Sequence, residues 1–358
     1  LKKTVRWVVG IVLGVYIGTI VLLNIPNIQQ AMSVFVAEEL SEVLNTKVVI
    51  GRINIGLLNR IIIDDVLLDD QSGQEMLKVT RLSAKFDIMP FFKGKISISS
   101  VQLFGFNINL RKETPDSPPN FKFVLDAFAS KDTVKKENSL DLRINSILIR
   151  RGRMSYHVLS EEETPGKFNA KHIQLQNIIA NISLKALSKD SLNLGIKRLS
   201  LDEKASGFSL KKMSLKLVAN NKQTNIDNFT IELPETSLKL DTIHLEYDSL
   251  KAFDRFTEQV HFSFRTLPSQ VTLKDISPFV PILSHFKEPV TLDMEVKGTV
   301  DQLTCSHLEI TADDRQFRLR GDVSLQDLSR PQDAYVYGTL SELSANTRGV
   351  GFLVRNLS

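Results

Sequence analysis

The sequence predicts a mostly β protein of elongated repeat architecture, preceded by a transmembrane helix and an amphipathic helix. Three observations predict this: a recurring strand-like spacing of apolar residues, an uncharged apolar segment near the N-terminus, and little helical pattern after residue 45. The recurring spacing is apolar, polar, apolar, polar, polar, apolar, polar, apolar, and it is clearest at residues 96–103. Further strict copies begin at Leu77, Leu194, Phe208 and Leu238.

The recurring spacing indicates β-strands that contain a bulge. On a helix its apolar positions would scatter, whereas on a strand each half alternates and the doubled polar spacer resets the phase. Spacers such as Ser99-Ser100 and Lys197-Arg198 lack the Asn-Gly or Asp-Gly chemistry of two-residue hairpins. We therefore predict one longer strand with a bulge at each copy, which keeps all its apolar side chains on one face. Bulges at matched heights would curl a sheet around that face.

Residues 1–25 are predicted to be a membrane anchor. No charged residue lies between Arg6 and Glu38, and residues 7–23 are nearly all apolar. Lys2, Lys3 and Arg6 precede this segment, so the positive-inside rule predicts a cytoplasmic N-terminus and a single pass through the inner membrane of a bacterium. The bulk of the chain would then be periplasmic. A cleaved signal peptide is the alternative, but residues 24–26 are Asn-Ile-Pro and not a small-residue cleavage site.

Residues 26–45 are predicted to form an amphipathic helix that plugs the membrane-proximal end of the sheet. Pro26 suits the first turn of a helix. A helix lying on the membrane surface is the alternative, but Glu38, Glu39 and Glu42 disfavour binding to anionic headgroups. The apolar face is expected to consist of Ile28, Met32, Phe35, Val36, Leu40, Val43 and Leu44.

Residues 46–358 are predicted to be one repeating β region with few helices. Turn chemistry is expected at residues 69–73, 93–94 and 220–221, and short helices at 121–128, 250–256 and 276–286. Asp64, Asp65, Asp69 and Asp70 lack the spacing of an EF-hand, which favours turn chemistry over calcium binding. Strands are expected at 48–55, 61–68, 77–88, 95–103, 106–111, 142–149, 153–158 and 171–180, and they continue to residue 245 and beyond.

A sheet with one apolar face needs a cover, and the predicted helices are too few to supply it. Either the sheet closes on itself as a sandwich or barrel, or it forms an open trough whose apolar side is covered by a ligand with long apolar chains. The residues expected to line this face are Leu77, Val79, Leu82, Ile96, Ile98, Val101, Leu103, Leu142, Ile144, Ile147, Ile149, Leu194, Ile196, Leu199 and Leu201.

Catalytic motifs are missing from the sequence, so we predict a protein that is not an enzyme and has no cofactor or metal. There is no P-loop, glycine-rich nucleotide turn or zinc motif, and the single cysteine, Cys305, forms no internal disulfide. The net charge of +4 is spread out and excludes a nucleic-acid footprint. Residues 161–163 are interpreted as a solvated charge cluster. The histidines are expected to stand singly, as surface or packing residues: His157, His172, His244, His261, His285 and His307.

The order of these features resembles the AsmA-like superfamily and, within it, the TamB family (translocation and assembly module, inner-membrane component) in a form typical of Bacteroidetes. The resemblance covers nearly the whole chain. Residues 86–98 are similar to the family's "pLLxGxIxIxxVxL" step, and residues 142–154, with Gly152, repeat it. The other matching segments are the two helices and residues 48–55, 61–68, 194–210 (with Glu203, Gly207 and Phe208) and 296–321.

The resemblance implies a long, taco-shaped β-groove with an apolar interior, anchored in the inner membrane. Such proteins are thought to carry phospholipid between the two membranes and to assist outer-membrane protein assembly, with an outer-membrane barrel partner of the TamA/BamA type. Members of the family are much longer and end in a C-terminal domain that this sequence does not contain, so no residue here is assigned to the partner contact.

The sequence also allows two functions other than lipid transport. A scaffold or chaperone for outer-membrane barrels would pair client strands with exposed sheet edges. An anchored enzyme is disfavoured by the missing catalytic groups. Residues 317–325 and 334–340 still alternate, and residues 349–358 follow with no expected capping helix. The sequence therefore predicts the membrane-proximal part of a longer groove, prone to associate at its C-terminal edge.

Overall fold

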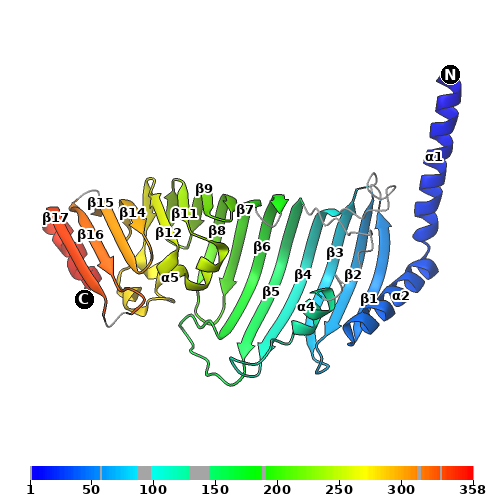
Figure 1. The fold of residues 1–358 in the computed structure, drawn as a ribbon, viewed down its shortest axis with the longest axis horizontal. Helices are drawn as coiled ribbons and strands as arrows, with labels where there is room; N and C mark the ends of the chain where they lie inside the picture. Colours follow the sequence, from blue (N-terminus) through cyan, green and yellow to red (C-terminus); the bar gives the residue numbers. More distant parts are fainter. Residues whose placement is uncertain are drawn as a thin grey trace. The chain divides into compact units, whose positions relative to one another are not determined.

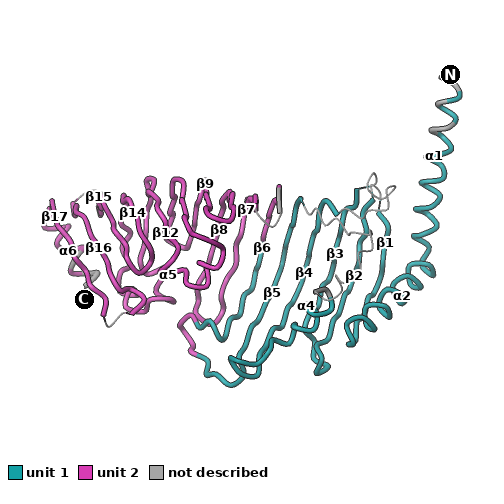
Figure 2. Tube along the Cα trace, viewed as in Figure 1, with its two compact units in different colours: residues 1–163, 169–179 teal, residues 164–168, 180–358 magenta. Residues whose placement is uncertain are grey.

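The computed structural model describes residues 2–56, 59–87, 98–129, 145–187, 191–312, 316–330 and 333–357. The chain divides into two compact units, which Figure 2 colours separately. Unit 1 comprises residues 1–163 and 169–179, and unit 2 comprises residues 164–168 and 180–358. The fold is mostly β, as the sequence predicts, and the strands form a large mixed sheet. The division into an anchor (residues 1–25), a helix (26–45) and a single β region (46–358) stays a prediction from sequence.

Unit 1 begins with two helices, α1 (Lys2–Leu23) and α2 (Pro26–Leu44), which Figure 1 shows in blue. They meet at a bend of 71°. Within the described residues, no single helix has the length and hydropathy to cross a membrane, although the bent pair of residues 10–23 and 26–44 meets these criteria together. α2 begins with Pro26 in its first turn and ends at Asn45, whose φ of 49° is left-handed.

The strands of unit 1 lie in one layer. β1 (Val48–Gly56), β2 (Arg60–Asp69), β3 (Glu75–Phe86) and β4 (Ile98–Lys112) pair in sequence order as an antiparallel meander. β5 (Ser146–Val158) then pairs with β4 in parallel. The chain between β4 and β5 carries α4 (Lys122–Ala129), and β6 (His172–Leu187) starts in unit 1 and ends in unit 2.

Unit 2 is a second series of paired strands, β7 to β17, most of them antiparallel neighbours along the chain. β9 pairs with both β10 and β11, while β14 pairs with both β12 and β13. The strands are β7 (Ser191–Glu203), β8 (Ser209–Asn220), β9 (Gln223–Glu232), β10 (Ser237–Leu240), β11 (Ile243–Glu246), β12 (His261–Arg265), β13 (Ser269–Val271), β14 (Val290–Gly298), β15 (Gln302–Ala312), β16 (Phe317–Gln326) and β17 (Tyr335–Ala345). The helices are η1 (Leu250–Arg255), α5 (Phe256–Gln259), η2 (Leu273–Ile276), η3 (Pro281–His285) and α6 (Thr347–Leu357).

The doubled polar spacers coincide with bulges at several of the predicted places. The register between β3 and β4 shifts where Phe86 pairs with Ile98 and Lys85 with Ser100, leaving Ser99 as the extra residue. The register between β7 and β8 shifts twice, between Ile196 and Leu199 and between Leu199 and Leu201. These shifts fall at the spacers Lys197-Arg198 and Lys211-Lys212, so the bulge prediction is confirmed there.

Several expected boundaries are wrong. Residues 98–103 and 106–111 belong to one strand, β4, and residues 153–158 continue β5, because a left-handed residue bends each strand without ending it. The copy at residues 238–245 is instead divided into β10 and β11, because the Asp241 N–H bonds to the Arg265 carbonyl at 2.9 Å and leaves the ladder with β9. The expected absence of a helix over 349–358 is also wrong. α6 occupies this segment, and Phe352 packs on Phe317 and Ala312.

Candidate functional site: the apolar face of unit 1

The sheet of unit 1 carries apolar residues that align across all five strands on one face. The first row joins Ile53, Ile63, Leu82, Leu103 and Ile149, and each neighbouring pair in it is a direct cross-strand pair. A second row, one step along each strand, joins Ile55, Ile61, Ala84, Val101 and Ile147. Directly opposed side chains in a sheet touch, so each row is a continuous apolar strip.

Two further rows lie on the other side of a kink in the strands. The third joins Ile50, Val66, Val79 and Phe106, whose ring lies over Gly152 of β5, and the fourth joins Val48, Leu68, Leu77, Ile108 and Met154. Along every strand the step from the first row to the third is three residues, where regular alternation allows two. We call these four rows together the apolar face.

The kink keeps the four rows on the same face. The register places Gly51, Asp65, Thr80, Gly105 and Arg151 at one height across β1 to β5. Asp65, Gly105 and Arg151 have φ values of 56°, 64° and 56°, in the left-handed region. A single left-handed residue turns the chain so that the next side chains resume the original face. Left-handed residues thus lie at one height in β2, β4 and β5.

The opposite face of these strands carries a row of mostly charged residues. Arg52, Asp64, Arg81, Phe104 and Arg150 form a cross-strand row there, one residue along from the first apolar row. The Arg81 guanidinium pairs with the Asp64 carboxylate, with Nε 2.6 Å from Oδ1. The Arg151 guanidinium lies 5.2 Å from the centre of the Phe104 ring. Arg52, Arg81, Phe104 and Arg150 of this row are exposed.

Two helices cover one end of the apolar face. Met32, Val36 and Leu40 of α2 pack on a buried cluster that includes Val48 and Ile53 of β1. Phe121, Phe123, Val124 and Ala127, in and just before α4, pack on the same cluster. Figure 1 shows α2 beside β1 and α4 in front of the neighbouring strands. The cluster contains Ile50 and Ile53, which lie on either side of the kink in β1. The helices therefore cover apolar rows on both sides of the kink.

The face of α2 differs from the one expected from sequence. Met32, Val36, Leu40 and Leu44 do face the sheet. Phe35 and Val43 were expected there too, but they are 62% and 57% exposed. The buried positions left by this rotation are taken by Gln29 and Ser33. Gln29 donates a 2.7 Å hydrogen bond to Asn54 of β1, which anchors the start of α2 to the sheet through polar contacts.

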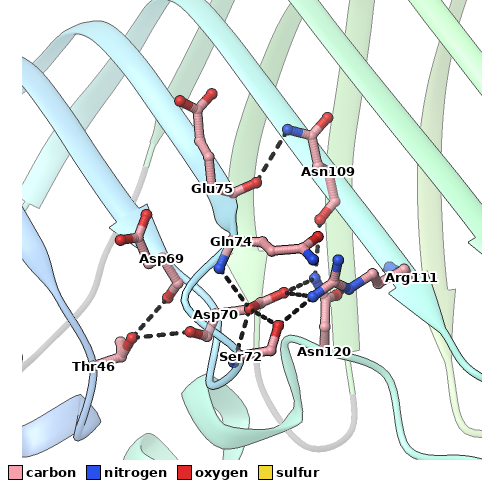
Figure 3. Close-up of polar contacts among 9 residues, drawn as sticks. All are labelled: Thr46, Asp69, Asp70, Ser72, Gln74, Glu75, Asn109, Arg111 and Asn120. Carbon is pink, nitrogen blue, oxygen red and sulfur yellow. Dashed lines mark hydrogen bonds and ion pairs between the residues drawn. The ribbon is translucent and has the colours of Figure 1, made fainter.

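A polar network holds this helical cover in place (Figure 3). Asp70, in the turn after β2, is 3% exposed and binds the Arg111 guanidinium of β4 at 2.7 Å. Its other carboxylate oxygen accepts hydrogen bonds from the Ser72 and Gln74 backbone. Asn120, just before α4, donates to Asp70 at 3.2 Å, and Thr46, just after α2, donates to the Asp70 carbonyl at 3.1 Å. Asp70 therefore connects the ends of both helices to the sheet, as turn chemistry predicts for this aspartate.

The same contacts keep Asp70 ionised. Burial acts to raise the pKa of Asp70, but hydrogen bonds from the side chains of Ser72 and Asn120 and the backbone of Gln74 and Ser72 lower it below the ordinary 3.8. The carboxylate is consequently a charged structural group at neutral pH, and Arg111 supplies its counter-charge.

Beyond the two helices the apolar face stays partly exposed. Val101, Leu103, Ile147 and Ile149 are half-buried, whereas Val48, Ile50 and Ile53 under α2 are buried. In the described part of unit 1, the cover comes from helices and no second sheet packs there. The expected lining residues Leu77, Val79, Leu82, Val101, Leu103, Ile147 and Ile149 thus lie together in rows. Ile98 pairs with Phe86 at the bulge, and Ile96, Leu142 and Ile144 lie outside the described residues.

The predicted residues of unit 2 form rows of the same kind. Leu194 of β7 pairs with Leu217, which pairs in turn with Ile226 and then Ile243. Leu199 leads through Met213 and Ile231 to Leu238. Ile196 pairs with Leu215, and Leu201 with Leu210. Each of the two units therefore contains its own cross-strand apolar rows.

The expectation that every histidine stands singly is wrong for two of them. His157 at the end of β5 and His172 at the start of β6 approach each other, and Glu163 of the connecting loop lies beside them. Sequence reasoning missed this cluster because the ligands are separated by a long loop and not by a motif spacing. The available signal was their position at the facing ends of consecutive strands.

Comparison with known proteins gives no relatives: no family model, no curated protein and no solved structure matches this chain. The resemblance to the TamB family therefore stays a prediction from sequence.

Proposed function

We propose that the protein is a membrane-anchored carrier that holds lipid acyl chains against the apolar face and shields them from water. The observation that carries this proposal is the alignment of four apolar rows across β1 to β5, opposite a charged face and only partly covered by α2 and α4. A partly exposed apolar surface of this extent is unusual unless a ligand or partner covers it.

The dimensions of the rows suit an acyl chain. Five paired strands span four gaps of about 4.8 Å, or about 19 Å. One leaflet of a bilayer is about 15 Å deep in its hydrocarbon part, so a row is long enough for one lipid tail. Each methylene removed from water contributes about 0.8 kcal/mol, which makes loading favourable without catalysis. The charged headgroup would stay in water at the rim of the face.

The proposed location is the inner membrane of a bacterium, with most of the chain in the periplasm. It is supported by α1, whose apolar side chains have little protein around them: Ile11, Val12 and Val15 are 59%, 63% and 65% exposed. Lys2, Lys3 and Arg6 flank this segment on one side only. Together with the sequence resemblance, this favours a taco-shaped groove of the TamB type that conveys phospholipid towards the outer membrane and an outer-membrane barrel partner of the TamA/BamA type.

Site-specific photo-crosslinking tests the proposal in intact cells of a Gram-negative host. A photoreactive amino acid is placed at Val101, in the second apolar row, or at the adjacent Gln102, which points to the opposite face. Both positions are half-buried, so they form a matched pair. Mass spectrometry of the purified adducts is expected to find phospholipid at Val101 and little at Gln102. Protein-only adducts at Val101, or equal lipid capture at both positions, would overturn the proposal.

A second candidate function is a scaffold for outer-membrane proteins, and β17 favours it. Within the described residues β17 pairs with β16 alone, and Val336, Tyr337 and Leu343 are 65%, 64% and 61% exposed. An edge strand with exposed apolar side chains can accept a client strand. A photoreactive residue at Tyr337 that captures unfolded barrel proteins, while Val101 captures no lipid, would favour this function.

A further inference from the structure

The facing ends of β5 and β6 bring two imidazoles and a carboxylate together within unit 1. His157 Nδ1 lies 3.1 Å from His172 Nδ1 and 3.8 Å from Glu163 Oε1. The three ligand atoms all lie within 4.8 Å of one another. None of these three residues belongs to the apolar face. The cluster therefore has no role in the proposed binding of lipid.

The hydrogen bonds of His172 fix which of its nitrogens carries the lone pair. His172 is 7% exposed, and its Nε2 lies 2.9 Å from the carbonyl oxygen of Glu161. A carbonyl only accepts, so Nε2 carries the hydrogen. In the neutral ring the lone pair is then on Nδ1, directed at His157. Metal-binding histidines commonly donate their second N–H to a backbone carbonyl in this manner.

The loop that supplies the carbonyl is itself firmly held. The Glu161 N–H donates to the Val158 carbonyl at 3.0 Å, and the Glu161 carboxylate pairs with the Lys171 ammonium at 2.7 Å. The Val158 N–H donates to the Lys171 carbonyl at 2.9 Å. The Asn169 side chain donates to the carbonyl of Glu162. The site is therefore preorganised by contacts that do not use its ligand atoms.

We propose that His157, His172 and Glu163 bind a divalent transition-metal ion, with Zn²⁺ the best match. Two imidazole nitrogens and one carboxylate oxygen form a ligand set typical of zinc sites with an open fourth position. Ligands at 2.0–2.1 Å on a tetrahedron are about 3.3 Å apart, close to the separation of the two Nδ1 atoms. Ca²⁺ and Mg²⁺ are poorer matches because they prefer six or more oxygen ligands.

A proton is the rival occupant of the site. If the His157 Nδ1–H donates to His172 Nδ1, a neutral hydrogen bond satisfies both rings without a metal. The two occupants differ in what they require. A metal ion uses Glu163 as a ligand and saturates at one ion per chain, whereas a hydrogen-bonded pair has no specific affinity for zinc.

Zinc titration of the full chain, purified in detergent with any affinity tag removed, tests the site. We expect one Zn²⁺ per chain, with the affinity reduced by at least about tenfold in His157→Gln and in Glu163→Gln. Glu163 is 61% exposed, so its replacement leaves folding intact even if a histidine variant does not. The matched control is His244→Gln, because His244 Nε2 lies 3.0 Å from Glu246 Oε1 but, among the residues that the structure describes, belongs to no cluster of three ligands.

Thermal unfolding gives a second measurement on the same proteins. Zn²⁺ should raise the unfolding temperature of the wild type and of His244→Gln, and have little effect on Glu163→Gln, because a ligand stabilises only the state that binds it. Two results would overturn the metal site: no saturable zinc binding by the wild type, or equal affinity in the wild type and Glu163→Gln. Either would leave the histidines as a pair that shares a proton.

Discussion

The Phe106 ring on β4 lies directly over Gly152 on β5. A β-carbon at position 152 would stand 2.4 Å from the Cζ atom of this ring and 3.0 Å from Cβ of Ile178 on β6. Glycine is therefore required at position 152 for packing and not for its backbone freedom. Gly152 follows the left-handed Arg151, so this contact lies next to the kink, at the β5 end of the third apolar row.

Gly152→Ala should lower the stability of the chain by about 1–3 kcal/mol, since the ring of Phe106 must leave its packed position. Gly56→Ala is the control, because the nearest atom to a β-carbon there is 3.4 Å away. Chemical unfolding followed by circular dichroism measures both. Adding Phe106→Leu to Gly152→Ala should restore part of the loss, and a failure to do so would show that the clash is not the cause.

Asp70→Asn should destabilise unit 1 by about 2–4 kcal/mol, because an amide in this place turns a donor towards Arg111 or loses an acceptor for Ser72. Asp69→Asn, in the same turn, is the matched control and should change stability little. A comparable loss in both variants would contradict the role given to the Asp70 carboxylate.

The stability that Asp70 contributes should depend on pH. The pKa of Asp70 is lowered in the folded chain, so its contribution is fully present above the ordinary value of 3.8 and is lost as the pH falls through the folded value. Acid unfolding of the wild type should therefore steepen below about pH 4. In Asp70→Asn the free energy of unfolding should fall less steeply in this acid range. An identical pH dependence of stability in the two proteins would refute the contribution given to Asp70.

Asp65→Val should destabilise the chain by about 1–2 kcal/mol, because a β-branched residue is strained at its left-handed φ of 56°. Asp65→Gly should be tolerated. Thr80→Val is the control at the same height, since Thr80 is already β-branched and is not among the residues with positive φ. Unfolding midpoints of the three variants should rank Asp65→Val lowest, and equal midpoints would argue against the kink.

Ile147→Asp should reduce lipid capture at Val101 far more than it reduces stability. Ile147 is the direct partner of Val101 and is half-buried, so a charge there meets lipid or water and not a sealed core. Leu148→Asp, on the opposite face, is the control and should leave capture unchanged. Complete unfolding by Ile147→Asp would instead indicate a closed protein core.

The apolar spacing predicts much of unit 1 because it records which side chains share a face. Leu82, Leu103 and Ile149 follow the repeat and lie in one row. The spacing does not encode strand direction, so the parallel pairing of β4 with β5 was not predicted. It also does not distinguish a kink from a strand end, and the doubled spacer at Asp241-Thr242 ends a strand while Thr80-Arg81 does not.

The helices and the polar contacts were less predictable. Helical periodicity located α2, but polar partners of Gln29 on β1 decide its rotation and leave Phe35 exposed. Arg111 and Asp70 are far apart in the sequence and meet only because β2, β3 and β4 are neighbours. The pairing of His157 with His172 likewise depends on tertiary structure, which no local motif records.

The parallel step between β4 and β5 has a consequence for how unit 1 reaches its native state. β1 to β4 are antiparallel neighbours in sequence order, so each can pair as soon as it emerges from the ribosome. β5 must wait for the whole segment after Lys112 to be synthesised, and its loop closure is entropically costly. Until then the unpaired edge of β4 and the apolar side of the nascent meander are exposed, so we expect mispairing to be most frequent before β5 is added.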